Sequence, residues 1–197
     1  MSIGVFEVSF ELDLLKSCHG NFTEYSMLPV PWRYVQDWNC TACGLCCKGY
    51  DVVLDFPEWM KIVKAYGVGF TRPGISSFFL KHKNDDTCAF LSNFYGRWVC
   101  GLQEHLKPIA CKLWPFKVSD KPKFGRPNEA VYRYGDRRLF VYVDPFCPGL
   151  RWGSPDSGFV RETLSEFVDL AVGLRRKQCY STSRMFSSNY GQSWKLV

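Results

Sequence analysis

Hydrophobic and polar residues alternate strictly over residues 6–14, near the start of the chain. This period of two predicts a half-buried β-strand. Residues 16–38 are rich in aromatic side chains without a regular period, and Pro29 and Pro31 would interrupt a helix, so irregular structure is predicted there.

A helical period follows over residues 56–66, where the apolar positions are Trp59, Ile62, Val63 and Tyr66. Asp55 and Glu58 match a capping box, and Pro57 stands in the first turn, where its missing N–H costs nothing. Gly67 is a natural C-terminal stop.

Residues 70–127 are short segments between Pro and Gly, and metal is expected to hold them together where regular packing cannot. Two β-rich runs around Gly135-Asp136 predict a hairpin over residues 130–144. A final helix is predicted over residues 157–179, with Val160, Leu164, Phe167, Val168, Ala171 and Leu174 on its apolar face.

These elements predict an α+β fold: a single small domain over residues 1–180, with an irregular Cys-rich middle, a β-hairpin and a C-terminal helix. The Ser- and Asn-rich residues 181–197 predict a flexible tail.

The composition is that of a globular protein, 46% hydrophobic and 22% charged, which excludes a mainly disordered chain. No uncharged run approaches the roughly 20 residues of a membrane span. The start of the chain alternates and is acidic, unlike a secretory signal, so a cytoplasmic protein without membrane contact is predicted. Cytoplasmic thiols are usually reduced, which favours metal binding by the ten cysteines over disulfides.

Four of these cysteines stand within eight residues, at Cys40, Cys43, Cys46 and Cys47. The repeated two-residue gap of Cys40-x2-Cys43-x2-Cys46 presents three sulfurs on a tight curve, as in [4Fe–4S] proteins, where a remote Cys-Pro completes the ligands. Cys147-Pro148 has that form, and Gly44 permits the sharp turn. Cys88, Cys100 and Cys111 stand singly between them.

Zinc is the main alternative to an iron–sulfur cluster, although structural zinc sites usually use two Cys-x2-4-Cys knuckles and this chain has one dense region. Disulfide or redox pairing is the third interpretation of the cysteines, because intracellular disulfides occur in hyperthermophiles. Cys46 and Cys47 are adjacent, and neighbouring side chains point opposite ways in extended backbone. We therefore expect Cys47 to serve a second metal or to remain a free thiol.

The chain resembles the CxxCxxCC family of zinc- or iron-chelating cysteine-cluster proteins, which includes flagellin lysine N-methylases. The matching segments are Cys40–Cys47, Cys88-Ala89-Phe90-Leu91, Gly96-Arg97 before Cys100, Lys107-Pro108 with Cys111-Lys112-x-Trp114-Pro115-Phe116, and Cys147-Pro148-Gly149. The gap from Cys100 to Cys111 is one residue longer than the family pattern, and Gln103 replaces an aromatic or His. The resemblance implies metal ligation by all eight matching cysteines, and methyl transfer from S-adenosylmethionine as an alternative activity.

Other residues have less specific patterns. Cys18 and Cys179 lie outside the ligand pattern, His82 and His105 are typical of surface or packing positions, and Trp114-Pro115-Phe116 is expected to pack over the cluster. The basic residues 121–126 and Arg137-Arg138 fit a nucleic-acid surface, although a net charge of +6 is modest. No Gly-rich nucleotide motif is present.

Three functions follow. The first is a [4Fe–4S] protein whose cluster is structural or exchanges electrons with a redox partner protein. The second is a cluster-dependent methyltransferase that uses S-adenosylmethionine on a protein lysine. The third is a nucleic-acid or ribonucleoprotein partner with a structural zinc.

Overall fold

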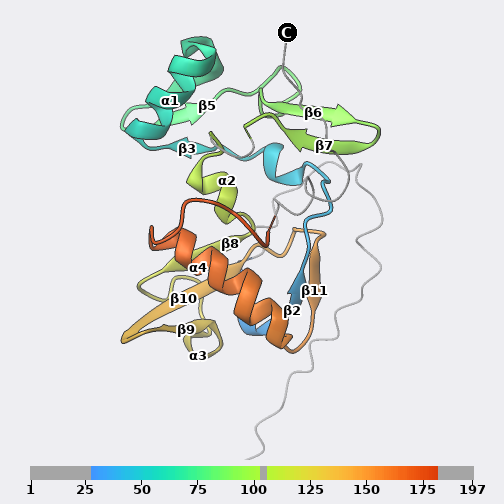
Figure 1. Cartoon of the computed structure of the whole chain (residues 1–197), viewed down its shortest axis with the longest axis vertical. Helices are drawn as coiled ribbons and strands as arrows, with labels where there is room; N and C mark the ends of the chain where they lie inside the picture. The colour runs from blue at the N-terminus through green and yellow to red at the C-terminus, as the bar shows by residue number, and fades with distance from the viewer. Residues whose placement is uncertain (1–27, 103–105, 182–197) are drawn as a thin grey trace, which may run out of the picture.

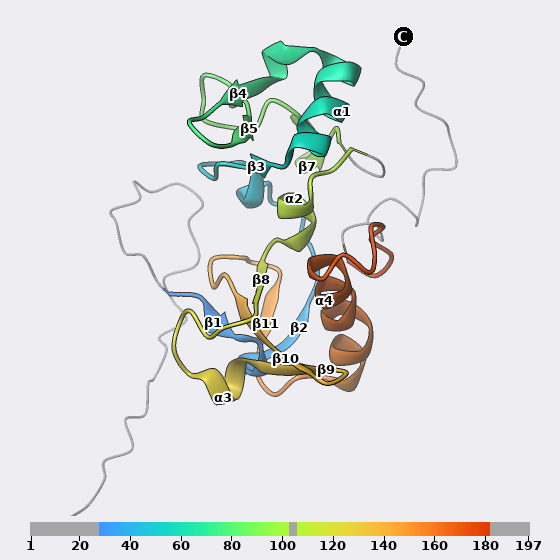
Figure 2. The same ribbon diagram turned by 90° about the vertical axis from the view of Figure 1, so that its left-hand side faces the viewer.

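The computed structural model describes residues 28–102 and 106–181. Figure 1 shows two halves stacked along the long axis, with α2 (Ile109–Leu113) between them, and Figure 2 shows the same division from the side. One half contains α1 and β3 to β7, and the other contains β1, β2, β8 to β11, α3 and α4. The predicted strand over residues 6–14 lies outside the described residues.

An antiparallel sheet forms the half that contains α4 (Ser165–Ala171), in the order β1-β10-β8 with β9 also paired to β10. The strands are β1 (Val30–Pro31), β8 (Phe116–Ser119), β9 (Val131–Tyr134) and β10 (Arg137–Val143), and the short helix α3 (Pro127–Ala130) precedes β9. Strands β9 and β10 form the predicted hairpin around Gly135-Asp136, which is confirmed.

The core of this half, here called the β10 core, joins the buried face of the sheet to α4. Val141 and Val143 lie on the same face of β10, as a period of two requires, and belong to one core with Phe167 and Val168 of α4. Tyr142 between them faces the other way and is also buried. The β10 core consists of Trp32, Val35, Trp38, Phe116, Leu139, Val141, Val143, Cys147, Phe159, Leu164, Phe167 and Val168.

A separate two-stranded ladder pairs β2 (Val35–Trp38) with β11 (Leu150–Trp152). The prediction of irregular structure over residues 16–38 is therefore wrong at its described end, where β1 and β2 flank the 3₁₀ turn Trp32–Tyr34. Pro31 breaks no strand, because β1 ends at that residue. The ladder is important for the site, since β2 leads directly into the cysteine-rich segment.

The other half is built from short antiparallel pairs and α1 (Phe56–Tyr66). Its sheet has the order β3-β5-β4, made of β3 (Val53–Leu54), β4 (Thr71–Pro73) and β5 (Phe78–Leu80), and β6 (Leu91–Phe94) pairs with β7 (Arg97–Cys100). The helix predicted over residues 56–66 is confirmed, with the Asp55–Glu58 capping box and Gly67 at its end.

The core of this half, here called the α1 core, is smaller. It consists of Val52, Leu54, Ile62, Leu80, Cys88, Phe90, Leu91 and Leu102. The fold class is α+β, as predicted. One domain over residues 1–180 stays a prediction. No helix of the described residues combines the length and the apolar character that crossing a bilayer requires.

The C-terminal helix is shorter than predicted. A π-helical stretch (Phe159–Leu164) runs into α4, which ends at Ala171, whereas the prediction extended it to residue 179. Gly173 has a φ of +80°, which favours glycine and turns the chain away, and Leu174 is 75% exposed rather than on the apolar face. Of the predicted tail, residues 182–197 lie outside the described residues.

Candidate metal centre

The eight cysteines of the predicted ligand set all line one cavity of about 70 Å³. A single water needs about 10–15 Å³, so the cavity has room for more than one water molecule. Its lining also includes Trp38, Val52, Leu80, Leu91, Trp98, Lys107 and Trp114. Cysteines separated by up to 107 positions in the sequence are thus brought together in space.

The cavity lies where the two cores meet. Trp38 and Cys147 reach it from the β10 core, and Leu80, Cys88 and Leu91 reach it from the α1 core. The cysteine-rich segment that follows β2 runs between the two, so the site joins both halves of the molecule.

The cysteine-rich segment turns sharply at Ala42 and Gly44, which have φ angles of 55° and 76°. Trp98 of β7 closes over this turn, because its N–H donates to the Ala42 carbonyl at 2.9 Å and its indole lies against Gly44. A Cβ at residue 44 would come within 2.7 Å of the Trp98 Cγ, so Gly44 serves both the turn and the close approach.

Cys46 and Cys47 lie in the 3₁₀ turn Leu45–Cys47, and their Sγ atoms are 3.8 Å apart. Both line the cavity. The expectation that adjacent cysteines point in opposite directions is therefore wrong. It assumed extended backbone, whereas the left-handed Gly44 starts a tight turn that carries both side chains to the same side.

Cys147 is held against the end of β2. The Trp38 indole Nε1 donates to Cys147 Sγ at 3.2 Å, and the Asn39 N–H donates to the Gly149 carbonyl at 3.0 Å. Cys40 follows Asn39 directly, so the β2–β11 ladder places Cys40 and Cys147 at the same side of the cavity.

The three isolated cysteines reach the cavity from the other half. The Cys88 N–H donates to the Cys47 carbonyl at 2.8 Å, and the Leu91 N–H donates to the Cys88 carbonyl at 2.9 Å. Leu91 pairs with Cys100 across β6 and β7, and Cys111 comes from α2. Backbone hydrogen bonds therefore connect Cys47, Cys88 and Cys100 in one chain of contacts.

Burial dominates the electrostatics of these thiols. It raises the pKa of Cys40, Cys88, Cys100, Cys111 and Cys147, the last to about 11. The pKa of Cys46 instead falls to about 7, mainly because of its hydrogen bond with Cys47, and the same contact raises the pKa of Cys47. Most of the cavity thiols therefore hold their protons at neutral pH unless a metal displaces them.

Lys107 also lines the cavity and is only 8% exposed. Its charge lowers the pKa of Cys40, Cys46, Cys100 and Cys111 in opposition to their burial. The sequence matched Lys107 to a family position without indicating this role, and it did not indicate Trp38 at all. No local pattern identifies either side chain, since both depend on the way the two halves meet.

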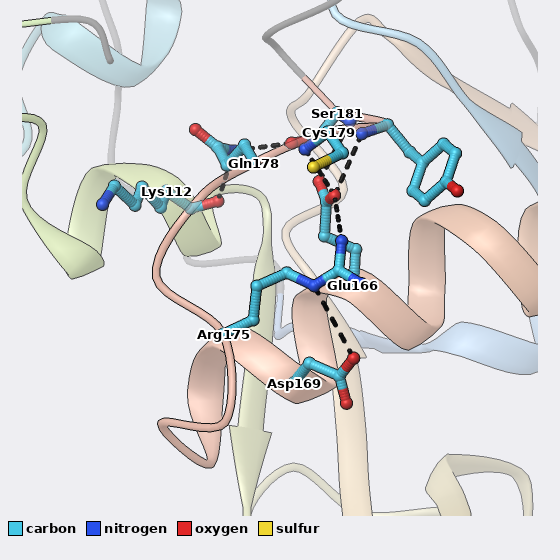
Figure 3. Close-up of polar contacts among 8 residues, drawn as sticks. Lys112, Glu166, Asp169, Arg175, Gln178, Cys179 and Ser181 are labelled. Atoms are coloured by element: carbon cyan, nitrogen blue, oxygen red, sulfur yellow. Dashed lines mark hydrogen bonds and ion pairs between the residues drawn. The ribbon is translucent and has the colours of Figure 1, made fainter. Parts of the chain in front are cut away.

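The C-terminal segment is fastened to α4 by Glu166, whose side chain has no exposed surface (Figure 3). This carboxylate accepts the backbone N–H groups of Cys179 at 2.6 Å, Tyr180 at 3.0 Å and Ser181 at 3.1 Å. Arg175 adds a contact at 3.2 Å. We call residues 175–181 the C-terminal clasp.

The clasp also contacts α2, the helix that carries Cys111. Lys112 Nζ donates to the Arg176 carbonyl at 2.7 Å. Gln178 Nε2 donates to the Lys112 carbonyl at 3.2 Å (Figure 3). Cys111 immediately precedes Lys112, so the clasp steadies one wall of the cavity through its neighbour.

Other predicted residues lie where the sequence suggested or outside the described range. Trp114 lines the cavity, and Phe116 packs in the β10 core. His82 lies 3.1 Å from Asp86, away from the cavity lining, and Cys179 is an exposed free thiol. Cys18 and His105 lie outside the described residues.

Two of the basic residues predicted as a nucleic-acid surface contact neighbours in their own chain. Arg137 pairs with Asp120 at 3.1 Å, and the Arg126 guanidinium lies over the Tyr34 ring. Exposed contacts of this kind contribute little to stability and do not test nucleic-acid binding, which stays a prediction.

Within residues 28–102 and 106–181, no three Cys, His, Asp or Glu side chains are close enough together to hold one metal ion. The thiols surround the cavity instead of forming a tight tetrahedron. Comparisons with protein-family models, curated proteins and solved structures find no match for this chain. The resemblance to the CxxCxxCC family therefore stays a prediction.

Proposed function

We propose that this protein binds metal through the thiolates of its eight cavity cysteines, and that the metal is an iron–sulfur cluster of the [4Fe–4S] type. The observation that carries the proposal is the convergence of Cys40, Cys43, Cys46, Cys47, Cys88, Cys100, Cys111 and Cys147 on one cavity. Thiolate sulfur is the ligand that zinc and iron–sulfur clusters take from proteins. The donor set therefore fits either group.

The spread of the sulfurs favours the cluster over a single ion. Four sulfurs about 2.3 Å from one zinc lie about 3.8 Å apart. The Cys46 and Cys47 sulfurs have that separation, but no third metal-binding side chain of the described residues joins them closely enough to hold one ion. A [4Fe–4S] cluster takes its thiolates at its corners, so its ligands stand around an inorganic core. Thiols that surround a cavity suit that arrangement, and zinc is the alternative.

When bound, a cluster of this type supplies one-electron transfer or a rigid structural centre. The protein's own residues would tune it. Trp38 donates an N–H to the Cys147 sulfur, and the Lys107 ammonium offsets thiolate charge. The rings of Trp98 and Trp114 line the cavity and limit water entry. A redox partner protein is the corresponding partner.

Methyl transfer from S-adenosylmethionine and nucleic-acid binding rest on the sequence, and none of the contacts described above favours either. Methyl transfer would require measurable binding of S-adenosylmethionine to the cluster-loaded protein. Nucleic-acid binding would require an affinity that falls steeply with salt.

The proposal is tested by anaerobic purification followed by iron, acid-labile sulfide and zinc analysis. We expect brown protein in which iron and sulfide are equimolar. Cys179→Ser is the control for a cysteine outside the site, because Cys179 is exposed and does not line the cavity. This variant should retain the full metal content of the wild type. Colourless protein with stoichiometric zinc would contradict the cluster, and protein without either metal would contradict the whole proposal.

A further inference from the structure

The geometry points to two adjoining four-cysteine centres in the cavity, an inference that rests on the proposed function. The first, here called the β2 centre, consists of Cys40, Cys43, Cys46 and Cys147. The second, here called the β7 centre, consists of Cys47, Cys88, Cys100 and Cys111. Both offer four thiolates to a metal with affinity for sulfur. An iron–sulfur cluster takes ligands that stand apart, whereas a zinc ion would have to draw its four sulfurs together, because no three side chains of the described residues are close enough to hold one ion.

The β2 centre belongs to the β10 core. Cys147 is a buried member of that core, and Cys40 packs against it. The Trp38–Cys147 and Asn39–Gly149 hydrogen bonds fasten the two together at the end of the β2–β11 ladder. Cys43 lies three residues beyond Cys40, before the turn at Gly44, and lines the same cavity as Cys40 and Cys147.

The β7 centre belongs to the α1 core. Cys88 is a buried member of that core, and Cys47, Cys100 and Cys111 pack against it. Cys47 is joined to Cys88 through the backbone hydrogen bond at 2.8 Å. Leu91 then connects Cys88 to Cys100, by its own hydrogen bond to Cys88 and by its pairing across β6 and β7.

The boundary between the centres falls between Cys46 and Cys47. The hydrogen bond to Cys88 and the packing in the α1 core assign Cys47 to the β7 centre. Cys46 continues the two-residue spacing of Cys40 and Cys43, and it completes four sulfurs for the β2 centre. The Sγ separation of 3.8 Å means that the centres are neighbours, each attached to a different core.

The competing arrangement is one centre that uses four cysteines, with the other four acting as small apolar side chains. The two arrangements differ in metal stoichiometry. One [4Fe–4S] cluster gives about four iron atoms per chain, and two give about eight. A cluster in one centre and zinc in the other give about four iron atoms and about one zinc.

The test begins with the wild-type chain, purified anaerobically and reconstituted with iron and sulfide, with zinc measured in parallel. About eight iron atoms, or about four with one zinc that survives dialysis against a chelator, supports two centres. About four iron atoms without retained zinc overturns them and leaves the proposed function intact. A chain without metal refutes the proposed function itself.

Paired variants then separate the centres. Cys43→Ser with Cys147→Ser disables the β2 centre, and Cys88→Ser with Cys100→Ser disables the β7 centre. Each folded variant, judged by gel filtration and circular dichroism, should retain the metal of the other centre, about half of the wild-type content for two like clusters. Loss of all metal from a folded variant overturns the partition, and so does full retention. If a variant does not fold, the wild-type stoichiometry decides.

Discussion

The Trp38 indole N–H points at the Cys147 sulfur and donates to it at 3.2 Å, inside the β10 core. An indole is a donor only, so the bond is best satisfied when the sulfur is an anion. This contact connects a buried side chain of β2 to one of the proposed ligands and provides a direct probe of the electronic state of the site.

Replacing Trp38 by Phe should lower the reduction potential of the bound cluster. The N–H stabilises the extra negative charge of the reduced state, so removing it disfavours reduction. A hydrogen bond worth about 1 kcal/mol more in the reduced state corresponds to roughly 40 mV for one electron. Potentiometric titration followed by electron paramagnetic resonance measures this shift.

Trp32→Phe is the matched control for that change. Trp32 lies in the same core, but its indole donates to the Val131 carbonyl at 3.2 Å and not to a sulfur. The potential of this variant should equal that of the wild type. An equal shift in both variants would show that the loss of core packing, and not the sulfur contact, sets the potential.

Metal affinity of the metal-free protein should increase with pH. Burial raises the pKa of most cavity thiols, so they are protonated at neutral pH and a metal must displace their protons. The apparent affinity for Co²⁺ as a spectroscopic probe should rise about tenfold per pH unit for each proton released. A Co²⁺ affinity that does not change between about pH 6 and pH 8 would contradict thiolate ligation.

Lys107→Met should move this dependence of metal affinity on pH toward higher pH. The Lys107 charge lowers the pKa of several cavity thiols, so its removal leaves them protonated to higher pH and weakens binding at neutral pH. Lys64→Met removes an exposed lysine on α1 and should leave the profile unchanged. Identical profiles for both variants would remove Lys107 from the site.

Glu166→Ala should destabilise the protein by about 3 kcal/mol, because three backbone N–H groups of the clasp lose a buried acceptor. Urea unfolding gives the free energy, and hydrogen exchange of the amides of residues 179–181 should accelerate. Asp169→Asn is the control. The Asp169 carboxylate contacts the Arg175 side chain at 3.8 Å but accepts no backbone N–H of residues 179–181, so a loss of under about 1 kcal/mol is expected. Unchanged exchange in Glu166→Ala would contradict the clasp.

Gly149→Ala should separate β11 from β2 and lower the metal content. A Cβ at residue 149 would overlap the Asn39 carbonyl, and the strain of overpacking is about 1–3 kcal/mol. Gly158→Ala provides the contrast, because a Cβ there meets nothing within 4 Å and the residue is helical. Gly149→Ala should therefore retain less iron and melt at a lower temperature than Gly158→Ala. Equal iron retention and equal melting temperatures would show that the β2–β11 contact does not position Cys147.

The sequence predicted best those features that depend on neighbouring residues. The helix over 56–66 begins and ends at local signals, the Asp55–Glu58 box and Gly67, and it formed as predicted. The C-terminal helix was predicted too long because the chain turns away at Gly173, and Glu166 then holds amides 13 to 15 residues beyond itself. No helical period indicates that contact.

The candidate site was likewise predicted only in part. The spacing and order of the cysteines identified the residues that line the cavity, whereas the direction of each side chain depended on the fold. The turn at Gly44 overturned the expectation that the Cys46 and Cys47 side chains point in opposite directions. Trp38 and Lys107 line the cavity only because the two cores pack together there, and that tertiary packing cannot be deduced from the local sequence.

The most direct test of metal binding by the cavity cysteines is their alkylation by a maleimide, mapped by mass spectrometry before and after metal removal, under reducing and anaerobic conditions. We expect Cys179 to be labelled equally in both states, because it is exposed and outside the cavity. The cavity cysteines should be labelled more slowly in the metal-loaded protein than after metal removal. The difference should be clearest for Cys46, because its lowered pKa makes it the most reactive of them in the metal-free protein. Equal labelling of these eight cysteines in both states would contradict the proposal.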